Sequence, residues 1–179
     1  MALFRERADV SVRPSIAPDD AAIARVQLRA WRSAHTTLLG AEVLERLDVA
    51  AVREQWARAI TTPPSPTHHV LVACDGARVV GFAASRPVEA GAEIAALEVD
   101  PDHQRGGHGS RLLAACVDLA RESGAQHVQT WVLDGDDARE QFLRGAGLGP
   151  DGARRDLGIG AGPDGGTQPV TERRWVAEI

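Results

Sequence analysis

Apolar residues spaced three and four positions apart dominate the first third of the chain, and this spacing predicts amphipathic helices. One helix is expected over residues 21–35, after the capping segment 18–20. A second is expected over 42–60, because the proline-rich segment 63–66 follows and stops it. Alternating apolar residues over 10–16 predict a short edge strand ahead of both helices.

The period changes from helical to alternating near residue 69. Residues 69–74 and 78–85 flank Asp75-Gly76, a dipeptide that supplies the positive φ angles of a tight turn, so a β-hairpin is expected. The other expected elements are a strand over 93–99, a helix over 107–123, a strand over 127–133, a short helix over 137–144, a glycine-rich loop over 158–166 and a last strand over 170–179. Several strands in a row with one strand-to-helix crossing predict an α/β or α+β domain of three layers around a mixed sheet.

Length, composition and charge narrow the class of protein. The chain has 179 residues, of which 44% are hydrophobic and 25% charged, the proportions of a single globular domain over 1–179. A net charge of −5 gives no reason to expect a nucleic-acid partner. The amino terminus is charged where a signal peptide would be apolar, and no apolar run reaches the roughly 18 residues of a membrane span. We therefore expect a soluble, cytoplasmic protein with no membrane partner.

The spacing of cysteines and histidines gives no indication of a metal. Cys74 and Cys116 stand alone in apolar stretches, without the CxxC spacing of zinc sites or the density of a disulfide framework. The histidines also lack a coherent ligand spacing. We therefore expect no bound metal and a reducing compartment.

The segment 99–113 is the most informative part of the chain. A buried strand stops at Pro101, and three glycines then lead into a helix, whose first backbone N–H groups have no acceptor within the helix. Glycines lack the Cβ atoms that would hold a phosphate away from the backbone, and Arg105 adds a positive charge beside them. The segment predicts a pyrophosphate-binding loop, with a glycine-rich turn that binds no ligand as the alternative.

Two other phosphate-binding signatures fit less well. A Walker loop requires a lysine, and the sequence contains none. A GxGxxG string does occur at 147–152, but it follows a predicted helix, includes Pro150 and opens into no helix with an apolar face. We interpret this second match as chance, which leaves the loop near residue 107 as the candidate phosphate site.

The motif residues resemble those of a known family. The string at 104–109, QRGGHG, has the form Q/R-x-x-G-x-G/A and follows a strand that ends LEVDP at residue 101. Together they resemble the central motif of the GNAT superfamily of N-acetyltransferases. The segment 136–148 is similar to a second motif of the family and matches its phenylalanine at Phe142, although the family's alanine falls on Arg139. The predicted helices before the hairpin, with WRSAH at 31–35 and LLG at 38–40, also resemble those of bacterial members, and the chain is identified as one of them.

The resemblance implies a fold and an activity. The GNAT fold is of the α/β (α+β) class, with a mixed, mostly antiparallel central sheet of six or seven strands flanked by about four helices. Members move an acetyl group from acetyl-CoA, the co-substrate, to a primary amine by direct attack in a ternary complex, without a metal. The implied acceptor is a small molecule or a peptide, and a homodimer is compatible with the family. The alternative is a catalytically weak acyl-CoA-binding sensor or regulatory module of the same fold.

The resemblance also assigns residues to the coenzyme and to the acceptor. The open edge of the strand 97–99 would pair with the pantetheine arm, and the backbone N–H groups of 105–110 would bind the pyrophosphate. The residues implied in coenzyme binding are Leu97, Glu98, Val99, Gln104, Arg105, Gly106, Gly107, His108, Gly109, Ser110, Asp136 and Phe142. An acceptor pocket would be lined by Trp31, His35 and Trp131, with packing in the core as the alternative for Trp31.

Direct attack requires a neutral amine, so a carboxylate or a water chain should remove its proton. Glu93 is the first candidate, because its strand resembles the one on which histone-type members hold their base. Residues 93, 95, 97 and 99 are expected to share one strand face. Glu98, on the opposite face, is the second candidate, and a solvated strand-end position is the alternative reading of Glu93.

The sequence departs from the family at the position of the acid. Tyrosine is absent from the chain, and Leu143 stands where the family often has a tyrosine that protonates the leaving thiolate. Asp136 stands where an asparagine is usual. Trp131 stands where the ribosomal-protein acetyltransferases have a glutamate, so a ribosomal alanine substrate is not expected. Because a free thiol has a pKa of about 8.5, the thiolate of coenzyme A can leave without an assigned acid.

Overall fold

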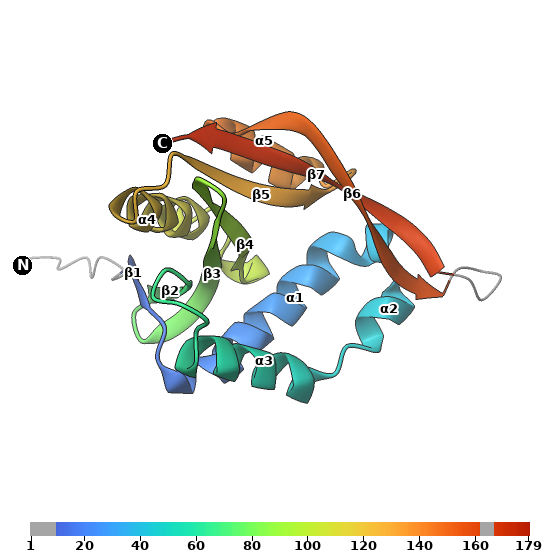
Figure 1. Cartoon of the computed structure of the whole chain (residues 1–179). Helices are drawn as coiled ribbons and strands as arrows, with labels where there is room; N and C mark the ends of the chain where they lie inside the picture. Colours follow the sequence, from blue (N-terminus) through green and yellow to red (C-terminus); the bar gives the residue numbers. More distant parts are fainter. Residues whose placement is uncertain (1–9, 162–166) are drawn as a thin grey trace, which may run out of the picture.

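Seven strands form one sheet within residues 10–161 and 167–179, the part of the chain that the computed structural model describes (Figure 1). The strand order is β1-β2-β3-β4-β5-β7-β6, and every neighbouring pair is antiparallel except β4 and β5, which are parallel. The strands are β1 (Val10–Pro14), β2 (His69–Asp75), β3 (Arg78–Val88), β4 (Gly91–Val99), β5 (His127–Leu133), β6 (Gly149–Ala161) and β7 (Thr167–Glu178). This mixed, mostly antiparallel sheet confirms the predicted fold class.

Five α-helices of the described chain cover the two faces of the sheet (Figure 1). They are α1 (Asp20–Leu39), α2 (Ala41–Glu45), α3 (Val49–Thr61), α4 (His108–Glu122) and α5 (Asp137–Gly145), with short 3₁₀ turns at η1 (Ala17–Asp19) and η2 (Pro101–His103). On one face, α4 and α5 pack in an apolar cluster that includes Leu112 and Trp175. On the other face, α1 and α3 pack in a second cluster that includes Ile23 and Phe82. Each amphipathic helix thus buries its apolar side against the sheet.

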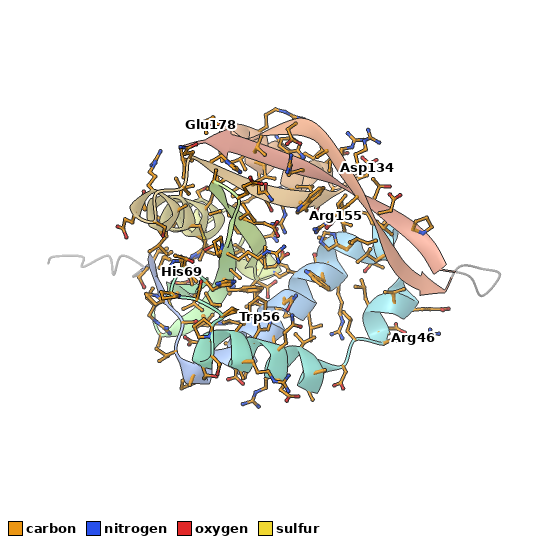
Figure 2. The ribbon with its side chains drawn as sticks, viewed as in Figure 1. Arg46, Trp56, His69, Asp134, Arg155 and Glu178 are labelled. Atoms are coloured by element: carbon orange, nitrogen blue, oxygen red, sulfur yellow. The ribbon has the colours of Figure 1, made fainter. Side chains whose placement is uncertain are left out.

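Trp56 anchors α3 to the rest of the second cluster. Its side chain points from α3 toward the sheet (Figure 2), and its ring centroid lies 4.9 Å from that of Phe82. The indole Nε1 donates a hydrogen bond to Gln27 Oε1 at 2.7 Å, so the polar atom of this buried side chain is satisfied. Trp56 is therefore a core residue.

The single helix predicted over 42–60 is wrong, because α2 and α3 are separate helices. Asp48 lies between them with an extended backbone. Its carboxylate accepts hydrogen bonds from the backbone N–H groups of Ala50 at 2.8 Å and Ala51 at 3.3 Å. Such an N-cap begins a new helix, and the apolar pattern alone did not reveal it.

The chain after α5 also differs from the prediction. Residues 149–152 of the GxGxxG string and the first residues of the loop predicted over 158–166 belong to β6, which pairs antiparallel with β7. Residues 162–166 of that predicted loop lie outside the described residues. The register of the pair shifts between Pro150 and Arg154, where Gly152 has a φ of 91°. Pairing with another strand supplies backbone hydrogen bonds that local composition does not predict.

β4 and β5 diverge, and this divergence opens the sheet. Their pairing runs only from Gly91 opposite His127 to Glu93 opposite Gln129. Just beyond it, the hydroxyl of Thr130 donates to the carbonyl of Ile94 at 2.8 Å. Within the described residues, the rest of β4 has no paired residue on β5. The carboxyl half of β4 therefore presents an open edge.

One extra residue in β4 changes which side chains share a face. Ala84 and Ser85 are consecutive in β3, whereas their partners in β4 are Ala96 and Ile94. Ala95 is thus the additional residue of a β-bulge. A bulge shifts the alternation of side chains by one position.

The prediction that Glu93 and Glu98 lie on opposite faces of the sheet is therefore wrong. Ile94 and Leu97 are three positions apart, yet both pack in the cluster on the α4 side of the sheet. Ala96 packs in the cluster on the α1 side. Alternate residues from 93 to 99 do not share one face, and Glu93 and Glu98 both lie on the face that α1 covers.

Candidate active site

Two cavities meet at the open edge of β4. The first, named here the loop cavity, has a volume of about 500 Å³ and lies between the end of β4, the segment leading into α4, and α5. The second, the tryptophan cavity, has a volume of about 260 Å³ and lies between α1, α2, β5 and the β6–β7 pair. Leu97, Glu98, Asp136 and Arg139 line both cavities, and these four residues are named the junction.

The loop cavity brings together all but one of the residues implied in coenzyme binding. Those that line it are Leu97, Glu98, Val99, Gln104, Arg105, Gly107, His108, Gly109, Ser110, Asp136 and Phe142. Gly106 lies outside the lining, and its carbonyl accepts a hydrogen bond from Arg111 Nη1 at 3.1 Å. The fold thus places the β4 edge, the glycine loop and the start of α5 around one space.

Asp100 fixes the start of the glycine loop. Its side chain has no exposed surface, and its carboxylate accepts hydrogen bonds from the N–H of Asp102 at 3.1 Å and from Arg29 Nη1 at 2.8 Å. Arg29 also donates from Nη2 to Asp102 at 2.8 Å, and this hydrogen bond lowers the pKa of Asp102. Through Arg29, α1 therefore holds the turn η2 in place.

The backbone of the glycine loop has the shape of an anion site. Arg105 has a φ of 63° and Gly107 a φ of 80°, and such left-handed turns direct successive N–H groups toward one side. In the described chain no side chain caps the start of α4, so its first N–H groups stay available at the positive end of the helix dipole. The loop therefore fits a diphosphate group.

His108 opens α4 as a buried, neutral imidazole. It is 4% exposed, and burial lowers its pKa from the ordinary value of 6.5. Its Nδ1 has no hydrogen-bond partner among the described residues. At pH 7 the formal positive charge beside the loop backbone therefore comes from Arg105 and Arg111 and not from His108.

The three residues predicted to line an acceptor pocket all line the tryptophan cavity. The ring centroids of Trp31 and His35 are 6.5 Å apart, and the guanidinium of Arg155 lies 4.3 Å from the centroid of the Trp131 ring. Arg155 also donates to the carboxylate of Glu172 at 2.5 Å. The aliphatic part of the wall includes Leu39, Val43, Leu44, Leu47, Leu133 and Leu157. The cavity is therefore mainly apolar, with charged groups in pairs at its edges.

Charged side chains meet at the junction. Arg139 donates from Nη1 to the carbonyl of Leu97 at 2.6 Å and from Nη2 to Glu98 Oε1 at 2.9 Å. Asp136 caps α5, because its Oδ1 accepts the backbone N–H of Arg139 at 3.0 Å. The other carboxylate oxygen of Asp136 lies 3.8 Å from His35 Nδ1. One guanidinium and two carboxylates thus lie where the cavities join.

The two candidate bases have different surroundings. Glu93 is 5% exposed and lines neither cavity; its Oε1 accepts from Arg86 at 2.7 Å and its Oε2 from Gln129 at 3.1 Å. The solvated position considered for Glu93 is therefore wrong. Glu98 lies at the junction, where Trp31 Nε1 donates to its Oε1 at 3.3 Å. The structure thus brings Glu98, and not Glu93, to the place where the cavities meet.

Arg139 lies at the junction, although the sequence pattern does not predict it there. Leu143, at the position of the family's acid, is 3% exposed within the core and offers no proton. Arg139 lies about one helical turn earlier on α5 and reaches the junction instead. The signal was present in the sequence, because Arg139 stands where the family has an alanine that could not reach so far.

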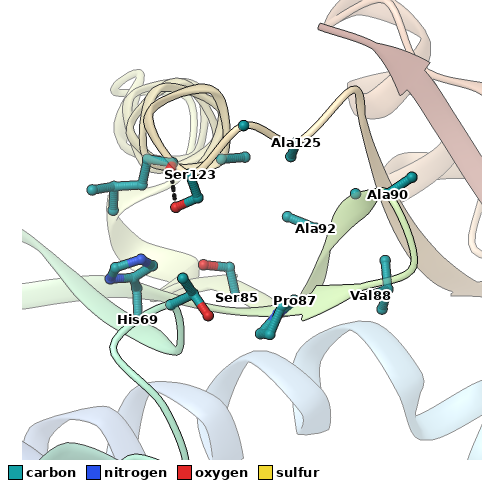
Figure 3. Close-up of a pocket in the computed structure, with 13 residues that line it drawn as sticks. His69, Ser85, Pro87, Val88, Ala90, Ala92, Ser123 and Ala125 are labelled. Carbon is teal, nitrogen blue, oxygen red and sulfur yellow. Dashed lines mark hydrogen bonds between the residues drawn. The ribbon is translucent and has the colours of Figure 1, made fainter.

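A smaller cavity of about 180 Å³ lies between the end of α4, the end of β3 and the start of β4 (Figure 3). His69, Ser85 and Ser123 are among its lining residues, and none of the predicted site residues lines it. The described part of the chain contains no cluster of three or more acidic, histidine or cysteine side chains placed to hold a metal. None of the helices in that part is long and apolar enough to cross a membrane.

The sequence itself matches a known family of acetyltransferases. Residues 26–148 match the profile described as the Acetyltransferase (GNAT) family. Because this match covers more than half of the chain, the protein belongs to that family and is an acyltransferase enzyme. No curated protein sequence is significantly similar to the chain.

Solved structures share the fold over nearly the full length of the chain. The PaiA N-acetyltransferase from Thermoplasma acidophilum, in complex with coenzyme A, has a TM-score of 0.78 at 14% identity, covering 96% of this chain and 99% of that one. A ribosomal-protein-alanine N-acetyltransferase from Brucella melitensis has a TM-score of 0.69 at 22% identity, covering 94% and 99%. The structure of YncA from Salmonella typhimurium with its cofactor acetyl-CoA has a TM-score of 0.66 at 20% identity, covering 95% and 94%. These likenesses show the GNAT fold.

Proposed function

We propose that this protein moves the acetyl group of acetyl-CoA to the primary amine of a small molecule or peptide, by direct attack in a ternary complex. The observation that carries the proposal is the meeting of two cavities at Leu97 and Glu98, on the open edge of β4. One cavity fits a diphosphate and the other is apolar, so a donor and an acceptor could approach each other from two sides. Two of the similar structures contain coenzyme A or acetyl-CoA, which supports the donor.

The residues of the loop cavity fit the donor in two parts. The loop around Arg105 and Gly107, with the start of α4, would hold the diphosphate. The open β4 edge at Leu97 and Val99 would hold the extended arm as an added strand. When bound, acetyl-CoA supplies a thioester whose sulfur is the leaving group.

Glu98 is the base that the geometry favours. Its side chain is 12% exposed and lines both cavities, so an amine in the tryptophan cavity could reach it. The nitrogen bonds to the acetyl carbon, the carbon–sulfur bond breaks with its electron pair going to sulfur, and the amine proton passes to Glu98. The thiolate then takes a proton from water, to which Glu98 later returns one. Glu93 stays a prediction that its position, outside both cavities, argues against.

The lining of the tryptophan cavity favours an amine on an apolar body. Its wall is aliphatic and aromatic, and such a surface binds alkyl or aryl groups through the hydrophobic effect. Three carboxylates line this cavity and each already has a partner: Glu172 pairs with Arg155, Glu98 pairs with Arg139, and Asp136 accepts the backbone N–H of Arg139. A polyamine with several charges would leave most of them without a free carboxylate in this cavity. Apolar monoamines are therefore the proposed acceptor class.

A panel of acceptors tests the proposal. The full-length protein would be incubated with acetyl-CoA and with aryl-alkyl monoamines, alkyl monoamines, polyamines, aminoglycosides, amino acids or short peptides. Thiol release and the mass of the acetylated product would be measured together. We expect product, with the highest kcat/KM for monoamines on apolar bodies. Binding of acetyl-CoA without product from any amine would contradict the proposal and favour a binding module.

A further inference from the structure

We propose that Arg139 stabilises the negative charge that develops on the thioester during acetyl transfer, the task that a tyrosine would share in related enzymes. The inference rests on the proposed function, because it concerns the reaction at the same junction. It follows from the position of the guanidinium, from the N–H groups of this side chain that have no acceptor among the described residues, and from the absence of tyrosine in the sequence.

The position of Arg139 is set from three sides. Its backbone is fixed by the cap that Asp136 provides at the start of α5. Its guanidinium is held by the carbonyl of Leu97 at 2.6 Å and the carboxylate of Glu98 at 2.9 Å. Its side chain is 22% exposed, so little water surrounds the charge. A guanidinium held in this way needs little reorganisation when charge appears beside it.

Arg139 retains hydrogen-bonding capacity at the junction. A guanidinium has five N–H groups, and within the described residues two of them have acceptors, Leu97 and Glu98. Among the described residues that line both cavities, Arg139 carries the only positive charge. The remaining N–H groups are therefore available to an anionic oxygen or sulfur at this place.

The chain has no phenol to serve the leaving group. It contains no tyrosine, and the residue at the expected acid position, Leu143, is buried among apolar side chains. A guanidinium does not give up its proton near neutral pH, so Arg139 is not an acid. Instead it would stabilise charge that forms first on the carbonyl oxygen and then on the sulfur. The thiolate leaves paired with this cation and takes its proton from water.

Variants of Arg139 separate this role from a merely structural one. Arg139→Ala removes the charge, Arg139→Lys keeps it without the planar fork, and Arg144→Ala on the same helix is the control, since Arg144 is 68% exposed and outside both cavities. We would measure kcat, KM for each substrate, acetyl-CoA affinity by calorimetry and Tm. The alanine variant would be assayed with and without added guanidinium ion, and with ammonium ion as the matched salt.

The expected pattern is specific to charge stabilisation. Arg139→Ala should lose about 100-fold in kcat, the usual cost of one oxyanion donor, with acetyl-CoA affinity within about threefold. Guanidinium but not ammonium should restore part of the loss, and Arg139→Lys should be intermediate. An unchanged kcat, a loss explained by weaker acetyl-CoA binding, or a loss that neither lysine nor guanidinium restores would overturn the inference. A wild-type protein that acetylates no amine would overturn the proposed function itself, and this inference with it.

Discussion

Arg29 on α1 and Asp100, the residue that follows β4, form an ion pair, with 2.8 Å between Nη1 and Oδ2, in which the carboxylate has no exposed surface. The same carboxylate accepts the N–H of Asp102 and so shapes the turn η2 before the glycine loop. The pair connects the helix that lines the tryptophan cavity with the loop that would bind the donor. The geometry of the loop cavity therefore depends on a residue outside the glycine motif.

Arg29→Ala should lower both stability and donor affinity. Removing the arginine leaves the buried carboxylate of Asp100 without its cation, which should cost about 2–3 kcal/mol in the free energy of unfolding. Urea unfolding and calorimetry with acetyl-CoA measure the two effects. The control is Arg121→Ala, because Arg121 pairs with Asp118 at 3.7 Å with both side chains exposed, and such pairs contribute under about 1 kcal/mol. Equal losses in the two variants would contradict the role given to Arg29.

Gly107→Glu should abolish tight binding of acetyl-CoA. A glutamate at this position places a second anion where the diphosphate is expected, so affinity should fall at least about 100-fold. Gly124→Glu is the matched control, since Gly124 has the same φ of 80° at the far end of α4 and open space around it. The Gly124→Glu variant has the same backbone strain, but at a position outside the loop cavity. If both variants bind acetyl-CoA equally well in calorimetry, the diphosphate site lies elsewhere.

The stability of the protein should depend on pH through His108. Burial lowers the pKa of this imidazole in the folded state below its ordinary value of 6.5. As the pH falls below 6.5, the histidine of the unfolded chain binds a proton before that of the folded protein. The free energy of unfolding therefore decreases as the pH falls toward the pKa of the folded state. His108→Gln should remove this part of the pH dependence, while leaving that of the other groups. An NMR titration of wild-type His108 with a midpoint at or above 6.5 would contradict the prediction.

Val43→Asn should weaken binding of the acceptor amine and leave binding of acetyl-CoA unaffected. Val43 lies on α2 in the apolar wall of the tryptophan cavity. Placing an amide there should raise the KM of an apolar amine by about tenfold, the equivalent of losing one or two buried methyl contacts. Val49→Asn, at a position 54% exposed and outside both cavities, is the control. An unchanged KM with the first variant would show that the acceptor binds elsewhere.

Much of the fold follows from local signals in the sequence. The Asp75-Gly76 turn predicts the hairpin of β2 and β3, and the glycine motif predicts the start of α4, because both depend on residues that are neighbours in the chain. The apolar pattern does not predict the break at Asp48, because a cap within such a pattern competes with the continuous helix that the pattern suggests. Local composition does not predict β6 either, because the hydrogen bonds of this strand come from β7.

The site was predictable to a similar extent. The loop cavity and the tryptophan cavity contain almost all of the residues that the family resemblance implied. The sequence could not show the bulge at Ala95, because one inserted residue leaves the apolar pattern of β4 nearly unchanged. That bulge decides the faces of Glu93 and Glu98, and the sheet divergence decides which of them lies at the junction. Both depend on pairing between strands.

The central claim, that acetyl transfer takes place at the junction with Glu98 as base, is tested most directly by two isosteric variants. We would measure kcat/KM across the pH range for Glu98→Gln and Glu93→Gln with an amine that the wild type acetylates, corrected for the folded fraction. Glu98→Gln should lose at least about 100-fold, the usual contribution of a positioned base, while Glu93→Gln stays within about threefold. Full activity of Glu98→Gln together with a large loss in Glu93→Gln would contradict the account.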